Sequence, residues 1–306
     1  MKRTYILISI LFCSQIIFSQ SINKVVTDEK GKQKMLGIIN EKGLKQAPFN
    51  VWFDANHDNY LVNNKIIKKL KDSLNQYTIK VFLGTWCGDS KKEVPQFYSI
   101  LDATKFPDSQ LETIALDNTQ DAYKQAPNHE EKGMNVHRVP TFIFYKNGKE
   151  VNRIVEHPKE TLERDMLKIV NGERYTPNYP AANFLQNQLA EITLDSLKRG
   201  ENRLVSMLSE YVKGSRELNT VGYIYLRANE LDKAMYVFDL NTKIFPYKYN
   251  VFDSLAEAYF EKENYTEALK NYYKVLSLKP DDKNAPEMIE KIKEKLGKDK
   301  TQEVKS

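Results

Sequence analysis

Cysteine is scarce in this chain of 306 residues, where it occurs only at Cys13 and Cys87. Once the apolar start that contains Cys13 is removed, one thiol remains and an internal disulfide is excluded. Glycine and proline are also sparse, with 12 and 11 residues, and charges of both signs are mixed, so most of the chain is expected to fold. The length and a hydrophobic content of 41% suffice for two globular domains with buried cores.

Two further patterns are missing. The formal net charge is only +5, and no basic cluster interleaved with aromatic residues occurs, so binding to nucleic acid is not expected. Three of the four histidines, His57, His129 and His157, lie far apart and lack the close Cys/His spacing of a metal site. We therefore predict no metal, no cofactor and no nucleic-acid partner.

Residues 1–20 are typical of a secretory signal peptide. A short apolar run follows the basic residues Lys2 and Arg3 and ends at small or polar residues at 19–21. A membrane anchor is the alternative, but polar residues interrupt the run, which is short for a bilayer crossing of roughly 20 residues. Cys13 leaves lipidation open as a lesser alternative. We expect export to the periplasm or cell envelope.

Cys87 occupies the point where an apolar strand that contains Ile79, Val81 and Phe82 turns into a helix. A sulfur there faces the unpaired N–H groups of the first helical turn and the positive end of the helix dipole, which stabilise a thiolate. The thiol therefore loses its proton more easily than a free thiol does. In an oxidising compartment, a single cysteine is either buried and inert or reactive toward other molecules. Cys87 is therefore the candidate nucleophile.

The pattern around Cys87 alternates between helices and strands. Apolar residues at helical spacing predict a helix over 91–103, in which Pro95 should introduce a kink. Two apolar runs joined by a polar turn at 146–149 predict a β-hairpin. The other predicted elements are a helix over 63–76, a strand over 111–117, hairpin strands over 139–145 and 150–155, and a helix over 159–170.

This part of the chain, roughly residues 61–173, resembles the thioredoxin family. The order and spacing of the motifs are more specific than any one of them. The matching residues are Trp86-Cys87-Gly88 with Ser90, Lys91 and Pro95, the step Val139-Pro140-Thr141, and the turn Phe144-Tyr145-Lys146-Asn147-Gly148.

The resemblance implies an α/β domain with a central mixed sheet flanked by helices. It also implies a cis peptide bond before Pro140, beside Cys87, where the backbone pairs with an extended substrate peptide. Trp86, Val139 and Pro140 are accordingly the expected substrate-binding residues.

Three residues depart from the family pattern. Ser90 replaces the second cysteine, so a mixed disulfide on Cys87 cannot be resolved from within the motif. Val81 stands where thioredoxins commonly keep a buried carboxylate that assists proton transfer. Asp89 replaces a proline, and its carboxylate favours the helix terminus while it repels a neighbouring thiolate.

Two functions follow as alternatives. In the first, Cys87 is the catalytic nucleophile, and Ser90 donates a hydrogen bond to its thiolate. Cys87 forms mixed disulfides with exported proteins. An outside thiol releases them in a reductase-like reaction, or another cysteine of the substrate releases them in an isomerase-like reaction. In the second, Cys87 is a vestige and the protein is a non-catalytic binding adaptor. His137 is either a base near the thiol or an ordinary loop histidine.

The domain boundaries follow from composition. A lead segment at 21–60 contains a turn between short strands and then, at 49–53, an apolar strand or docking segment, and it has no assigned function. The other predicted parts are the thioredoxin-like domain at 61–173, a proline-punctuated linker at 174–182, helical repeats with a capping helix at 183–297, and a tail at 298–306.

The helical part resembles tetratricopeptide (TPR) repeats, because it repeats at an offset of 34 residues. Small residues should let paired helices approach, and aromatic residues should fill the space between them. The family implies a groove that binds a peptide or protein partner. The aligned pairs are Gly222 with Ala256, Tyr225 with Tyr259, Ala234 with Ala268, Phe238 with Tyr272, and Pro246 with Pro280. The candidate groove residues, which are at least as well explained as ordinary surface residues, are Asn219, Tyr223, Asn250, Asp253 and Glu257.

Overall fold

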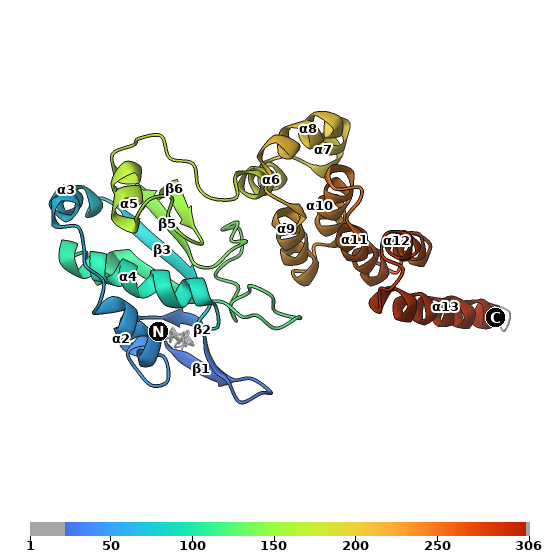
Figure 1. The fold of residues 1–306 in the computed structure, drawn as a ribbon, viewed down its shortest axis with the longest axis horizontal. Coiled ribbons are helices and arrows are strands. Elements are labelled where there is room, and N and C mark those ends of the chain that lie inside the picture. Colours follow the sequence, from blue (N-terminus) through green and yellow to red (C-terminus); the bar gives the residue numbers. More distant parts are fainter. Residues whose placement is uncertain (1–21, 304–306) are drawn as a thin grey trace, which may run out of the picture.

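The computed structural model describes residues 22–303, so the predicted signal peptide and Cys13 lie outside the described residues. An α/β domain comes first and is followed by a row of helices that ends in the long helix α13 (Asn284–Glu303) (Figure 1). Along the described residues, we find no helix with the length and apolar character needed to cross a membrane. The predicted fold class, a mixed α/β domain followed by an all-helical region, is confirmed.

The α/β domain is built on a six-stranded sheet with the order β1-β2-β4-β3-β5-β6. The central strand β3 (Thr78–Leu83) pairs in parallel with β4 (Leu111–Ala115) and antiparallel with β5 (Thr141–Lys146). β5 and β6 (Lys149–Val155) form the predicted hairpin. The sheet is therefore mixed, as predicted.

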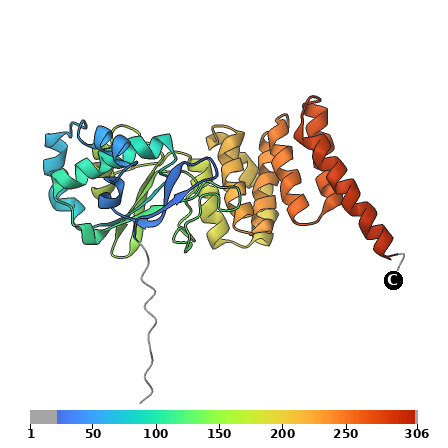
Figure 2. The same cartoon turned by 90° about the horizontal axis from the view of Figure 1, so that it is seen from below.

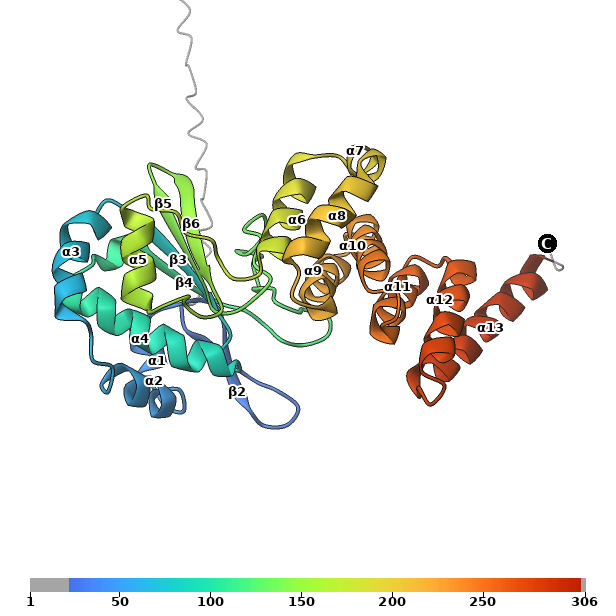
Figure 3. The ribbon, with the colours of Figure 1, turned by 45° about the horizontal axis from the view of Figure 1, so that its top comes forward.

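Helices cover one face of this sheet. Alternate residues of β3, such as Val81, join one large core with α3 (Asn64–Leu74), α4 (Gly88–Thr104) and α5 (Leu162–Val170). The alternation follows from the two-residue period of a strand. Figure 3 shows the three helices together on this face.

An irregular segment, residues 116–140, covers the opposite face. Phe82 and Ile143 point to this side and form a smaller core with Val136 and Val139. The segment lies between the sheet and the helical region (Figure 1). Its apolar residues do not recur at helical spacing, which explains why this covering layer contains no helix.

The lead segment extends the sheet. β1 (Lys24–Thr27) and β2 (Gln33–Ile39) pair antiparallel, and β2 continues antiparallel onto β4. The apolar run at 49–53, for which a strand or docking segment was predicted, forms the start of helix α2 (Asn50–His57) instead. Periodicity cannot separate a short strand from a helix here, but the packing does, because buried Phe49 and Phe53 are four residues apart and lie on one side of a helix.

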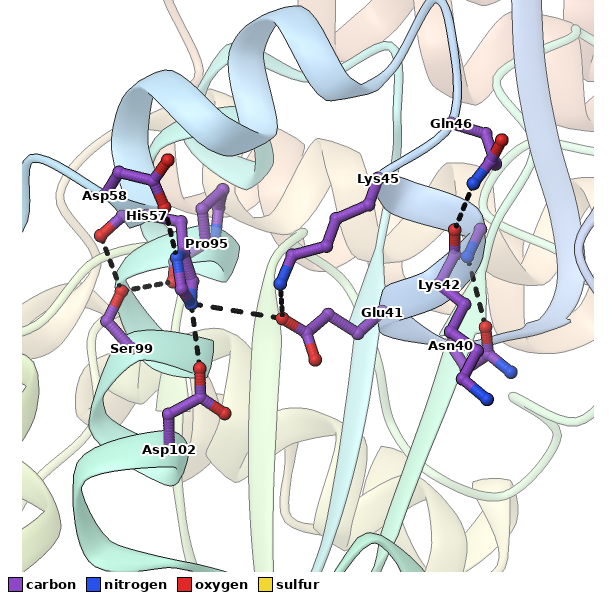
Figure 4. A network of polar contacts seen from close by, with 11 residues as sticks. Asn40, Glu41, Lys42, Lys45, Gln46, His57, Asp58, Pro95, Ser99 and Asp102 are labelled. Carbon is purple, nitrogen blue, oxygen red and sulfur yellow. Dashed lines mark hydrogen bonds and ion pairs between the residues drawn. The ribbon is translucent and has the colours of Figure 1, made fainter.

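Polar contacts join this segment to the end of α4 (Figure 4). Both ring nitrogens of His57 face carboxylates: Nδ1 lies 2.9 Å from Asp58 and Nε2 lies 3.0 Å from Asp102. Glu41, in the short helix α1 (Glu41–Leu44), lies 3.9 Å from Nε2 and forms an ion pair of 2.6 Å with Lys45. The lead segment is therefore joined to the α/β domain by polar contacts as well as by its apolar core.

The linker is bound to the α/β domain. Asn178 Nδ2 donates to the carbonyl oxygens of Val155 at 3.2 Å and His157 at 2.8 Å. Helix α6 (Pro180–Glu191) begins within the range predicted as linker. Proline suits the first turn of a helix because its φ is preset and no N–H is needed there, so Pro180 starts a helix rather than extending the break.

The helical region repeats as the sequence predicts: α11 begins 34 residues after α9, from Ser215 to Tyr249, and α12 begins 34 residues after α10, from Leu231 to Tyr265. α13 reaches Glu303, so the predicted tail at 298–306 begins as helix. Figure 2 shows the helices side by side. Besides α6 and α13, they are α7 (Leu194–Arg199), α8 (Glu201–Tyr211), α9 (Ser215–Arg227), α10 (Leu231–Ile244), α11 (Tyr249–Glu261) and α12 (Tyr265–Leu278).

Side-chain packing explains the small residues of the repeat. A Cβ atom at Gly222 would lie 2.2 Å from the ring of Phe238, so only glycine lets α9 and α10 pack this closely. Two of the candidate groove residues bond to each other, since the Tyr223 hydroxyl donates to Glu257 at 2.7 Å. These side chains join consecutive repeats.

Candidate active site around Cys87

Cys87 lies at the predicted junction between β3 and α4. It is the N-cap residue of α4, with extended φ and ψ of −87° and 132°. Its carbonyl oxygen accepts the Lys91 N–H at 3.0 Å, and its own N–H donates to Gly84 at 2.8 Å. The side chain makes no capping hydrogen bond and is partly exposed, so the sulfur is accessible at the positive end of a long helix.

The structure brings Cys87 together with the predicted substrate edge. The Cys87 thiol donates to the backbone oxygen of Val139 at 3.3 Å, and the Val139-Pro140 peptide bond is cis. The cis bond implied by the resemblance is confirmed. Asp89 Oδ2 lies 4.0 Å from the sulfur, so a carboxylate faces the position where the thiolate charge would form.

Ser90 has a different partner from the predicted one. It is fully buried, and its Oγ accepts the N–H of Gly84 at 3.1 Å. Among the described residues no hydrogen bond joins Ser90 to Cys87. Ser90 therefore closes the turn that presents Cys87, and its donation to the thiolate stays a prediction.

Trp86 is fixed beside the thiol. Its Nε1 donates to the Leu116 oxygen at 2.8 Å. Its ring lies against Gly84, where an added Cβ would be 2.5 Å from Cε2, so the close approach requires glycine at that position. The neighbouring Thr85 accepts the Met35 N–H from β2 at 3.0 Å. The lead segment thus supports the turn that carries Cys87.

Lys124 is a site residue that the sequence reasoning missed. It is buried in the irregular 116–140 segment, and its Nζ donates to the His137 oxygen at 2.7 Å. Burial and the charge of Arg138 together lower the pKa of Lys124 to about 7, although the electrostatic influence of Cys87 and Glu156 opposes them. Because this segment has no periodic pattern, nothing in the sequence set Lys124 apart from the other lysines.

His137 lies in the irregular segment, as the loop alternative predicts, and does not act as a charged group beside the thiol. Its ring is almost wholly buried and lies edge-on to Tyr179 of the linker at 5.8 Å. Burial, together with the charges of Lys124 and Arg138, lowers the pKa of His137 to about 3. It is therefore neutral near pH 7 and cannot stabilise a thiolate by charge. It is a loop histidine whose ring is buried between the α/β domain and the linker.

Val81 is wholly buried, and its register places it between Thr113 and Phe142. An apolar side chain therefore fills the position where the resemblance implied a proton-transferring carboxylate in other members. Among the side chains that the structure describes, one His/carboxylate group has the geometry to hold a metal ion, namely Glu41, His57 and Asp102. The sequence spacing did not indicate this group because three separate helices contribute to it, and the Lys45 ammonium already pairs with Glu41.

Comparison with known proteins agrees with this geometry. The family model described as Thioredoxin matches residues 59–168. Thioredoxin of Gallus gallus is 34% identical over 102 residues, which cover 33% of this chain and 88% of that protein. Thioredoxin H2 of Arabidopsis thaliana is 30% identical over 101 residues, covering 33% and 68%. Thioredoxin of Ophiophagus hannah is 31% identical over 100 residues, covering 33% and 86%.

Proposed function

The chain belongs to the thioredoxin family, and from that premise we propose that it is an exported protein that performs monothiol thiol–disulfide exchange on other exported proteins. The comparison with thioredoxins supports a thiol–disulfide oxidoreductase-like function. The observation that carries the proposal is the position of the Cys87 sulfur, which is accessible at the start of α4 and 3.3 Å from the Val139 oxygen beside the cis bond.

The exchange proceeds in two displacement steps. Cys87 first releases its proton to solvent, and the thiolate attacks one sulfur of a substrate disulfide. A new S–S bond forms between Cys87 and the substrate, the substrate S–S bond breaks, and the leaving substrate thiolate takes up a proton. Because Ser90 cannot attack this mixed disulfide, a thiolate of an external thiol or of another substrate cysteine displaces Cys87 in the second step.

The residues around the sulfur have distinct roles in this proposal. Val139 and Pro140 present the backbone edge that holds the substrate peptide, and Trp86 forms a wall beside it. Ser90 holds the turn through Gly84. Lys124 acts as a positioning residue, because its Nζ donates to the His137 oxygen and so holds the segment that leads to Val139.

The helical region recruits a partner in this proposal, as TPR repeats do. The 34-residue spacing of its helix pairs and the contact between Gly222 and Phe238 support its assignment as TPR repeats with α13 as the capping helix. Partner capture with the Cys87→Ala protein tests this role, because covalent substrates are lost and a groove-bound partner is retained. Recovery of the same proteins by a chain whose groove residues Asn219 and Asn250 are both changed to Ala contradicts it.

One observation favours the competing function, a non-catalytic adaptor. Asp89 faces the Cys87 sulfur at 4.0 Å and opposes the formation of a thiolate there. In that case both domains serve only to bind proteins. The rate at which Cys87 reacts therefore decides between the two functions.

The test is the reaction of the mature protein with a small neutral disulfide at pH 7, followed by mass spectrometry. We expect a mixed disulfide on Cys87 that forms faster than on a free cysteine thiol, and its release on addition of an external thiol. Cys87→Ala is the control. A reaction no faster than that of free cysteine, without trapped partners from the exported protein fraction, supports the adaptor. Sequencing of the mature N-terminus near residues 19–21 tests export.

A further inference from the structure

A cleft of about 730 Å³ adjoins the turn that carries Cys87. Three parts of the chain form its walls. The first is the turn between β1 and β2 with the start of β2, the second is the start of α2 with Phe49 and Trp52, and the third is the active-site turn with Trp86 and, one helical turn beyond Cys87, Lys91. The cleft therefore borders the residue that precedes the candidate nucleophile in the chain.

The charge of the cleft is strongly positive. Lysines 30, 32, 34 and 91 line it, whereas Asp28 is the acidic residue in the lining. Lys34 is neutralised by an ion pair with Asp117. The Asp28 carboxylate accepts the backbone N–H groups of Lys30 and Lys32 at 2.9 and 2.8 Å. Among the ion pairs of the described side chains, none involves Lys30, Lys32 or Lys91.

The cleft also offers apolar surface. Phe49 is buried in the core, and Trp52 is partly buried against that core and packs edge-on to Phe53. Trp86 forms the side nearest Cys87 and is fixed there by its hydrogen bond to Leu116. Rigid aromatic side chains next to unpaired ammonium groups suit a peptide that carries both apolar and acidic side chains.

Two of the three walls lie outside the part of the chain that matches the family. The match begins at residue 59, whereas the hairpin turn and the start of α2 precede it. The lead segment, for which no function was predicted, thus adds a cationic wall to the domain. The sheet pairing between β2 and β4 and the bond from Met35 to Thr85 hold this wall against the active-site turn.

We propose that this cleft binds an acidic segment of the substrate protein and holds its disulfide next to Cys87. The inference rests on the proposed exchange function and names its substrate class. Carboxylates of the substrate pair with Lys30, Lys32 and Lys91, while an apolar side chain packs on Trp52 and Trp86. The positive field also raises the rate of encounter with an acidic partner, an effect that salt screens.

The experiment compares two disulfide-bonded peptides, each with a leucine next to its cysteine. In the acidic peptide glutamates flank these two residues, and in the basic peptide lysines take the place of the glutamates. The readout is the ratio of their rates of mixed-disulfide formation with the mature protein, so any general change in Cys87 reactivity cancels. We expect the acidic peptide to react roughly tenfold faster at low salt, with the ratio approaching one at high salt. Lys30→Glu together with Lys32→Glu should abolish or invert the preference.

The matched control is Lys68→Glu together with Lys69→Glu, the same change of charge on exposed residues of α3 outside the cleft, which should leave the ratio unchanged. Equal rates for the two peptides, or the same loss of preference in this control, overturn the cleft while the exchange function stands. If neither peptide forms a mixed disulfide, the exchange function fails. Fluorescence anisotropy then measures how tightly the acidic and the basic peptide bind to the Cys87→Ser protein, which tests the cleft separately from the exchange. Equal binding of the two peptides overturns the proposed cleft.

Discussion

The two faces of the sheet differ in what covers them and in what is buried beneath. Under the helices α3, α4 and α5 the apolar core includes the tilted rings of Phe97 and Phe142, and the buried carboxylates Glu163 and Asp165 of α5 accept hydrogen bonds there. Under the irregular 116–140 segment, buried polar groups, among them Lys124 and His137, lie close to the Val139 edge. The comparison indicates that hydrogen bonds compensate the carboxylates buried under the helices, whereas the loop-covered face keeps Lys124 and His137 at a cost in desolvation.

The largest expected effect is a loss of activity on the loop-covered side. Cys87→Ala should abolish formation of mixed disulfides, because the sulfur is the nucleophile in the proposed reaction. The same change should alter the free energy of unfolding by less than about 1 kcal/mol, since the side chain is only partly buried. Mass spectrometry after disulfide challenge and urea unfolding give the two values, and a residual adduct on the variant contradicts the assignment of the nucleophile.

The next largest effect is a loss of stability on the helix-covered face. Phe97 is fully buried and its ring centroid lies 4.6 Å from that of Phe142. Phe97→Ala should lower the free energy of unfolding by about 3 to 5 kcal/mol through lost burial and a cavity. Tyr273→Ala, at a half-exposed position of α12, is the control and should cost far less. Equal losses for the two variants in urea unfolding contradict the assigned core.

Lys124, under the loop-covered face, should make the free energy of unfolding depend on pH. The pKa of its side chain is lowered to about 7 in the folded state, first by burial, from an ordinary value of 10.5. Between these values the unfolded chain binds more protons than the folded one, so stability rises with pH, by at most about 1.4 kcal/mol per pH unit. The cost of the buried lysine is fully present below pH 7 and is relieved above it.

Urea unfolding from pH 7 to 9 measures this rise. The Cys87→Ala background removes the contribution of the thiol, and adding Lys124→Met should remove the rise, by about 2 kcal/mol across the range. The methionine keeps the length and most of the apolar surface of the side chain. An identical pH profile for the two proteins shows that Lys124 titrates normally in the fold.

The smallest expected effect concerns the ion pair at the rim of the proposed cleft. Burial raises the pKa of Asp117, but hydrogen bonds from Lys34 and from the Thr119 and Asn118 N–H groups outweigh it and hold the pKa below its usual range. The pair therefore stabilises the fold above the ordinary carboxyl range, and the contribution is lost as pH falls through the lowered value.

Asp117→Asn should lower the free energy of unfolding by about 1 kcal/mol at pH 7 and by less at acidic pH. Lys34 loses its charged partner, and the hydrogen bonds from the Asn118 and Thr119 N–H groups are weakened. Thermal unfolding at pH 7 and pH 3 measures the difference. Asp121→Asn, four residues along in the same exposed loop, is the matched control. A loss that does not depend on pH indicates that the pair contributes through shape alone.

Much of the fold was predictable because its signals are local. The apolar strand before Cys87, the proline after Val139 and the hairpin turn at 146–149 each depend on a few neighbouring residues, and the structure places all three as expected. The 34-residue period also survives in the helix starts. The helix at 50–57 was missed because its apolar run is too short for periodicity to separate the two structures.

The site was less predictable because contacts across the chain decide it. The burial of His137 and the bond from Lys124 to its carbonyl oxygen each require knowing how the 116–140 segment folds onto the sheet, and the partner of Ser90 depends on the shape of the turn before α4. A polar side chain in an aperiodic stretch carries no sign of whether it will be exposed or buried.

By itself, the sequence determined the succession of strands and helices, the single thiol at a helix start and the repeat length of the second region, because propensity, periodicity and residue identity act over short stretches of chain. Only the tertiary structure decided the surroundings of that thiol. Burial, the charge of Lys124 and the wall added by the lead segment all arise from residues that are distant along the chain, and electrostatic and desolvation effects depend on distance in space.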